Sequence, residues 1–185
     1  MAFTPSTTTR TPRAVFMSSF VPRECGIATF TEDLINAVSA HGTTCKVVAM
    51  NRPRETHAYD ARVIATVREN TLADYLATAE QINAGRFDVL SVQHEFGIFG
   101  GEECDHLIRF LDAVRIPIVS TFHTVLRFPS PAMRRNLRAI AAQSNAIVVM
   151  NGLAIELLDD IYGIDPRKIV LIHHGAPVTP RERQA

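Results

Sequence analysis

Short apolar runs rich in β-branched residues alternate in this chain with longer segments that have the hydrophobic period of an amphipathic helix. Strand and helix patterns in this alternation form βαβ units, in which the strands are parallel and the crossovers are right-handed. The sequence therefore predicts a doubly wound, Rossmann-like α/β domain, with a parallel sheet of about seven strands and helices on both faces. The expected strands cover residues 14–20, 45–50, 62–66, 87–93, 116–124, 146–150 and 168–172, and the expected helices cover residues 29–40, 71–84, 102–114, 131–143 and 153–162.

The length and composition indicate one globular domain. Of the 185 residues, 46% are hydrophobic and 21% are charged, as in an ordinary soluble fold. This length is enough for one sizeable core and short for two full domains. We expect a flexible tail rich in Thr and Pro over residues 1–13, one domain over residues 14–178 and a polar tail over residues 179–185.

Charge and cysteine content limit the partners and the compartment. Lys plus Arg (19) equals Asp plus Glu (19), so the net positive charge typical of a nucleic-acid-binding domain is lacking and no nucleic-acid partner is expected. No apolar run approaches the roughly 18 to 20 residues of a membrane span, and residues 1–13 lack the apolar middle of a signal peptide. Cys25, Cys45 and Cys104 have neither metal-site nor redox spacing, which favours reduced thiols in a cytoplasmic protein.

A histidine follows the expected strand over residues 116–124. Ile118, Val119 and Phe122 form a buried-strand pattern behind a proline, and His123 comes at its end with Thr124 beside it. Ligands of open α/β sheets bind beyond the carboxyl ends of the strands, so His123 lies where a site is expected. A lone histidine at such a place is more often a hydrogen-bonded corner residue, and that alternative stays open.

Three other strand ends carry similar chemistry. Gly26 to Thr29 precede a helix, whose free N–H groups and dipole attract a phosphate or carboxylate, although neither a dinucleotide fingerprint nor a P-loop is present. The loop 93–101 joins Gln, His and Glu to three glycines, which is typical of a binding loop. Phe96, Ile98 and Phe99 of this loop are expected at an exposed apolar surface. His173, His174 and Gly175 follow the last strand.

The strand-end residues include side chains that could bind a metal, but they lack the spacing of a metal site. His94, Glu95, His123 and His174 contain a two-His, one-carboxylate set that would suit zinc or iron. No two of them share a helix at i, i+4 spacing, so no metal and no other cofactor is expected. The Gly-x-Ser-x-Gly elbow of an α/β-hydrolase is also missing.

Taken together, these motifs resemble the N-terminal half of a GT-B glycosyltransferase of family 4, the group 1 type that uses nucleotide sugars. Residues 26–30 are similar to the family's glycine loop and first helix, and Ser120–Thr124 to its strand-end histidine motif. Residues 172–175 resemble the Pro-His-Gly turn that closes the N-terminal domain, with His173 in place of the usual proline. Residues 93–97 resemble a subgroup that carries Gln-His-Glu-Phe-Gly. The resemblance covers about residues 14–178.

The resemblance implies a role for each motif. His123 would be the catalytic residue, hydrogen-bonded to the sugar that is transferred with retention. The backbone of Gly26 and Ile27 would face the donor's sugar phosphate, and His94 and Glu95 would lie on the acceptor side. The substrate-binding residues implied in this way are Gly26, Ile27, His94, Glu95, Thr124, His174 and Gly175.

The family's second Rossmann-like domain, which holds the nucleotide, has no counterpart in the sequence. The chain is therefore expected to be inactive alone, and to need a nucleotide-sugar donor, an unknown acceptor and a C-terminal domain in trans. A fragment, a split half, a homo-oligomer and a non-catalytic carbohydrate- or partner-binding module remain alternatives.

Basic residues cluster on the expected helix over residues 131–143. Arg134, Arg135 and Arg138 lie on it, and Arg127 precedes it. A solvated helix face is the commoner explanation of such a pattern. The functional explanation is weak peripheral contact with an anionic acceptor or membrane surface.

Overall fold

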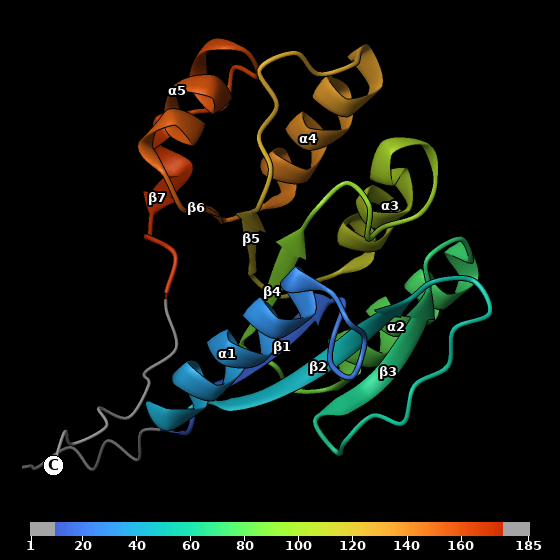
Figure 1. The fold of residues 1–185 in the computed structure, drawn as a ribbon. Coiled ribbons are helices and arrows are strands. Elements are labelled where there is room, and N and C mark those ends of the chain that lie inside the picture. The colour runs from blue at the N-terminus through green and yellow to red at the C-terminus, as the bar shows by residue number, and fades with distance from the viewer. Residues whose placement is uncertain (1–9, 176–185) are drawn as a thin grey trace, which may run out of the picture.

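The computed structural model describes residues 10–175. These residues form one seven-stranded sheet in the order β3-β2-β1-β4-β5-β6-β7, in which every neighbouring pair is parallel (Figure 1). The predicted fold class is therefore confirmed. Of the predicted tails over residues 1–13 and 179–185, only residues 10–13 are described, and Arg13 is already the first residue of β1. The rest of both tails, and the predicted end of the domain at residues 176–178, lie outside the described residues.

All of the predicted strands and helices are present, and no boundary differs from its prediction by more than three residues. The strands are β1 (Arg13–Ser18), β2 (Thr44–Asn51), β3 (Val63–Arg68), β4 (Val89–His94), β5 (Ile118–Phe122), β6 (Ala146–Val149) and β7 (Ile169–Leu171). The helices are α1 (Gly26–Ala40), α2 (Leu72–Ala84), α3 (Asp105–Ala113), α4 (Pro131–Gln143) and α5 (Gly152–Asp160), with short 3₁₀ turns η1 (Glu102–Cys104) and η2 (Pro166–Lys168).

The two faces of the sheet are covered unequally. On one face, Phe16 of β1 packs in a small core with Ile35 of α1. On the other, Val15 and Met17 belong to a larger core that receives side chains from α2, α3, α4 and α5. Because the chain moves from β1 toward β3 first and only later from β4 toward β7, right-handed crossovers place α1 on the opposite face from the later helices.

An apolar part of the sheet on the α1 side is left without a covering helix among residues 10–175. Val119 of β5 lies beside Ala146 of β6, and Val148 of β6 lies beside Val170 of β7. The first three are half-buried and Val170 is 46% exposed, whereas the alternate residues of β6 are buried under α4 and α5. We call these four residues the open strip. Such exposure is unusual, because parallel sheets are normally covered on both faces.

The loop after β4 departs from its prediction. Ile98 and Phe99 are only 3% and 5% exposed, so the expectation that they form an open apolar surface was wrong. Phe96 is half-buried and packs against the same core. The reason is a close approach of the loop to the chain after β3: a Cβ atom on Gly100 would collide with the backbone of Glu69. Glycine at this position lets the loop fold inward.

Candidate functional site

The site lies at the carboxyl edge of the sheet, where β1, β4 and β5 end near the N-terminus of α1 (Figure 1). The strand order reverses between β1 and β4, which is where open α/β sheets bind ligands. Gly26 and Ile27 form the first turn of α1 itself, because Ala28 and Thr29 already donate backbone hydrogen bonds to the Cys25 carbonyl. The prediction of a glycine loop with a helix that begins near residue 29 was wrong in this detail. A Cβ atom on Gly26 would meet nothing within 4 Å, so the helix end faces open space.

His123 follows β5 directly and is half-buried. Its Nε2 lies 3.0 Å from Oε1 of Gln93, and the Gln93 amide nitrogen in turn donates to the Ser91 hydroxyl at 3.0 Å. Since Gln93 offers its oxygen, Nε2 of His123 carries the proton and Nδ1 remains the acceptor atom. Burial lowers the pKa of His123 to about 4, although the Glu95 carboxylate acts in the opposite direction. The ring is therefore neutral near pH 7 and is held in one orientation.

Glu95 and Thr124 extend this cluster. The Thr124 hydroxyl donates to one carboxylate oxygen of Glu95 at 2.6 Å, and the Phe96 amide donates to the other at 3.0 Å. Both side chains are half-buried. The ends of β4 and β5 therefore present an imidazole, an amide and a carboxylate that are fixed by hydrogen bonds.

Phe30 of α1 connects His123 to the end of β7. Its ring centroid is 4.8 Å from that of His123 and 5.1 Å from that of His174, both with edge-on geometry. His174 is exposed, and its Nδ1 lies 2.6 Å from the Gly175 carbonyl oxygen. The α1 terminus, His123 and His174 are thus brought to one edge of the sheet, as the strand-end pattern predicted.

His94 is the exception. Successive side chains of a strand point to opposite faces, so Gln93 contacts His123 on the α1 side while His94 points into the larger core. The His94 ring is fully buried among Phe96, Phe99 and Phe122, at centroid distances of 5.0, 6.2 and 5.4 Å. Neither ring nitrogen has a hydrogen-bond partner among the described residues, and burial lowers the pKa of His94 to about 3. The prediction that His94 lines the cleft was therefore wrong.

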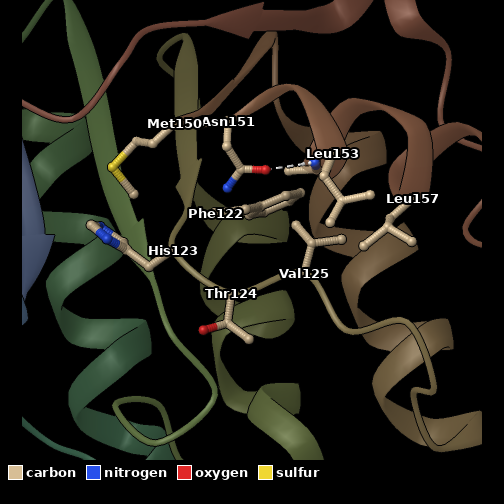
Figure 2. Close-up of a pocket in the computed structure, with 9 residues that line it drawn as sticks. Phe122, His123, Thr124, Val125, Met150, Asn151, Leu153 and Leu157 are labelled. Atoms are coloured by element: carbon tan, nitrogen blue, oxygen red, sulfur yellow. Dashed lines mark hydrogen bonds between the residues drawn. The ribbon is translucent and has the colours of Figure 1, made fainter.

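A hollow of about 260 Å³ adjoins His123, between the end of β5 and helix α5 (Figure 2). Asn151 caps α5, with its side-chain oxygen accepting a hydrogen bond of 2.9 Å from the Ala154 amide. The hollow is lined by Phe122, His123, Thr124, Val125, Met150, Asn151, Leu153, Ala154 and Leu157.

The comparisons with known proteins agree with this geometry. The model of the family described as Glycosyltransferase Family 4 matches residues 25–179, which include the α1 terminus, His123 and His174. The chain belongs to glycosyltransferase family 4. No curated protein is significantly similar in sequence to this family 4 chain.

Solved structures place the family 4 chain in one Rossmann-like half of a GT-B fold. An α-glucosyltransferase in complex with UDP and DNA is 13% identical, with a TM-score of 0.61, over 89% of this chain and 42% of its own. A glycosyltransferase from Rickettsia africae ESF-5 is 13% identical, with a TM-score of 0.60. The match covers 89% of this chain and 43% of the Rickettsia chain. A phosphomethylpyrimidine kinase from Clostridium difficile 630 is 14% identical, with a TM-score of 0.50. The match covers 88% of this chain and 66% of the kinase. At these identities the likeness concerns the fold alone, and the family 4 chain spans about two fifths of either glycosyltransferase.

Sequence reasoning gave no individual role to three residues of the candidate site. Gln93 orients His123, Phe30 lies between two histidines, and Asn151 stands at the hollow. Strand alternation could have paired Gln93 with the α1 side, and an Asn before a helix at a strand end is a recognisable N-cap. Phe30 belongs to the family-like segment 26–30 and to the apolar face of α1, but neither pattern indicates contact with two histidines. Within residues 10–175, no three His, Cys, Asp or Glu side chains cluster in a way that could hold a metal ion.

Proposed function

We propose that this domain is the acceptor-side half of a retaining glycosyltransferase. Together with a donor-binding domain it would transfer a sugar from a nucleotide sugar to a hydroxyl group of an acceptor, and alone it would be inactive. The observation that carries the proposal is the neutral, hydrogen-bonded His123 at the switch-point edge of the sheet, beside the open N-terminus of α1. Membership of glycosyltransferase family 4 supports the same reaction class.

The geometry suits the charges that develop in such a transfer. The bond from the sugar carbon to the leaving phosphate breaks while a bond from the acceptor oxygen forms, and the proton of the acceptor hydroxyl passes to the leaving phosphate. Negative charge therefore grows on the phosphate and positive charge on the sugar carbon. The first turn of α1 at Gly26 and Ile27, with the dipole of the helix, suits the phosphate. A fixed, uncharged His123 suits a sugar hydroxyl, because an oriented hydrogen bond that needs no reorganisation favours the transition state. Glu95, Thr124, His174 and Gly175 border this place and are proposed as further substrate contacts.

The partner of this domain is proposed to be a C-terminal donor domain, supplied by the same protein or in trans, rather than a second copy. The open strip supports a covering partner, because an apolar parallel sheet face is seldom left in water. The burial of His94 favours the rival function, a non-catalytic carbohydrate- or partner-binding module, since it removes one predicted acceptor contact.

Surface charge supports a proposal of weak peripheral contact with an anionic surface. Arg127, Arg134 and Arg138 are exposed, as is Phe128 (89%) next to Arg127 in the chain, while Arg135 lies 3.5 Å from Glu102. None of the helices within residues 10–175 has the length and apolar content to cross a membrane. In a vesicle co-sedimentation assay, the double substitution Arg134→Glu and Arg138→Glu should abolish binding to anionic vesicles. Equal binding of the variant and the wild type would remove this surface from the proposal.

The proposed compartment is the cytoplasm. The three cysteines are unpaired, and Cys45 and Cys104 are buried, as is usual for thiols in a reducing environment. The expected lack of a nucleic-acid partner rests on the charge balance of the chain and stays a prediction.

The test is reconstitution. The 185-residue chain is assayed alone and with the C-terminal domain of a family 4 glycosyltransferase, using a panel of nucleotide sugars and measuring nucleotide release and product together. Transfer should require both domains. Sugar transfer by the chain alone would contradict the proposal. Absence of transfer with every matched donor domain would also contradict it, and would leave the non-catalytic binding module as the function.

A further inference from the structure

We infer that the hollow beside His123 binds an uncharged apolar group of the acceptor, such as a short alkyl or aryl substituent next to the hydroxyl that receives the sugar. That the bound group belongs to the acceptor of a sugar rests on the proposed function. It adds the substrate class, which neither the family nor the fold specifies. The hollow itself, its lining and its chemistry are properties of the described residues.

The lining divides into two sides (Figure 2). Val125, Leu153 and Leu157 form an apolar side, and the ring of Phe122 lies next to Leu153. His123 and Thr124 belong to the opposite side, where the reacting hydroxyl would lie. A ligand that fits both sides is therefore amphipathic over a short length.

Asn151 adds a polar group at the boundary. Its side-chain oxygen is engaged by the Ala154 amide, so the group left for a ligand is the amide nitrogen. Figure 2 shows this nitrogen turned away from that hydrogen bond, toward the side on which His123 lies. An amide donor at this point suits an ether or hydroxyl oxygen that joins the apolar group to the rest of the acceptor.

The charges in and around the hollow exclude an anionic occupant. None of the nine lining residues is Asp, Glu, Lys or Arg, and burial keeps His123 uncharged near neutral pH. Placing an unpaired carboxylate against Val125 and Leu157 would leave a desolvated charge without a partner, which is strongly unfavourable. The Glu95 carboxylate, which accepts a hydrogen bond from Thr124 of the lining at 2.6 Å, adds repulsion. The hollow therefore selects against anionic substituents.

Size sets the extent of the bound group. Pockets that enclose a whole small ligand measure roughly 300 to 1,000 Å³, and this hollow measures about 260 Å³. It accommodates a substituent, while the remainder of the acceptor lies in the open cleft near α1. Leu153, which is 50% exposed, forms part of the lining and presents apolar surface to solvent until a ligand covers it.

Methyl-resolved NMR of the full 185-residue chain tests the inference without requiring activity. The chain is labelled at its Leu, Val, Ala and Met methyl groups and titrated with benzyl alcohol, glycerol and 4-(hydroxymethyl)benzoate. Benzyl alcohol should produce saturable shifts at Leu153, Leu157 and Val125, glycerol should produce none, and the benzoate should bind at least about tenfold more weakly. The methyl groups of Val148 and Val170 report on the alternative, binding to the open strip.

A matched pair of variants localises the binding. Leu153→Gln should raise the Kd for benzyl alcohol at least about fivefold, in the range expected when one apolar contact is lost. Leu76→Gln is the control, because Leu76 is 42% exposed on α2 and lies outside the hollow. The inference is overturned if no saturable shift occurs, if the shifts are confined to the open strip, or if both variants bind like the wild type.

The result separates this inference from the proposed function. Saturable binding in the hollow, with no transfer in the reconstituted assay, would refute the glycosyltransferase proposal and leave an apolar binding site. Transfer with no binding in the hollow and no preference for aryl or alkyl acceptors would refute the substrate class and leave the enzyme.

Discussion

Replacing His94 by phenylalanine should stabilise the domain, and more so in acid. His94 is fully buried in an aromatic cage, and neither of its ring nitrogens has a hydrogen-bond partner among the described residues. A buried donor or acceptor without a partner costs about 1–3 kcal/mol. Phenylalanine keeps an aromatic ring in the cage and removes both polar atoms. We therefore expect a gain of at least about 1 kcal/mol near pH 7.5.

The pH dependence gives a larger and more specific effect. Burial lowers the pKa of His94 to about 3 in the folded state, against about 6.5 in an unfolded chain. Between these values only the unfolded state takes up the proton, so the wild type loses stability as the pH falls below about 6.5. The loss is about 1.4 kcal/mol per pH unit, or about 2 kcal/mol between pH 7.5 and pH 5. The variant avoids this loss, while the contribution of His123 is common to both proteins and cancels in their difference.

Urea unfolding of both proteins at pH 7.5, 6 and 5 measures the effect. The advantage of His94→Phe should grow from about 1 kcal/mol at pH 7.5 to about 3 kcal/mol at pH 5. In thermal unfolding, the Tm of the variant should exceed that of the wild type by roughly 2–4 °C at pH 7.5 and by roughly 6–12 °C at pH 5. His41→Gln, which removes an exposed histidine just after α1, controls for the loss of one imidazole and should follow the wild type.

The slope with pH is the decisive quantity, because the somewhat larger phenylalanine ring can offset part of the gain at pH 7.5 through overpacking. A difference between variant and wild type that stays constant from pH 7.5 to pH 5 would mean that folding does not withhold a proton from His94. The ring would then have a partner, such as an internal water, and its description as an unpaired buried imidazole would fail.

Three further substitutions test other contacts. Tyr75→Phe removes the hydroxyl that accepts from the Gly100 amide, and should cost about 1–3 kcal/mol in urea unfolding; an unchanged midpoint would mean that the loop after β4 is held differently. Asn151→Ala removes the cap of α5 and should lower the free energy of unfolding by about 1 kcal/mol in the same assay, whereas Asn151→Ser should retain most of the stabilisation that the cap gives. In the reconstituted enzyme, His123→Ala should lower single-turnover transfer by about 10² to 10³ with nucleotide affinity unchanged, and an unaltered rate would remove His123 from the site.

The fold was predictable because it depends on periodicity. The alternation of apolar runs with helical patterns fixes a parallel sheet with right-handed crossovers, and caps such as Ser130 before Pro131 mark a helix start locally. The placement of Gly26 in the helix was less accessible. Glycine has low helix propensity, so the sequence favoured a loop there, and only the hydrogen bonds to Cys25 decide otherwise.

The site was predictable in position but less so in orientation. Strand ends indicate which residues reach the carboxyl edge, and His123 and His174 are found there. Strand alternation puts His94 on the same face of β4 as Leu90 and Val92, which belong to the larger core. Which face of the sheet α1 covers depends on the order of the strands, and no local pattern in the sequence shows it. The hollow likewise combines residues 122–125 with residues 150–157, and no local pattern joins them.

The order of the strands in the sheet has a consequence for how the chain can be made. β1 is synthesised first and takes an inner position, and each later strand pairs with one that has already been translated: β2 and β4 with β1, β3 with β2, and β5, β6 and β7 each with its predecessor. After β1, no strand has to wait for a first partner that is still inside the ribosome. The sheet can therefore grow outward during translation, which shortens the time that its apolar strands stay unpaired and open to aggregation.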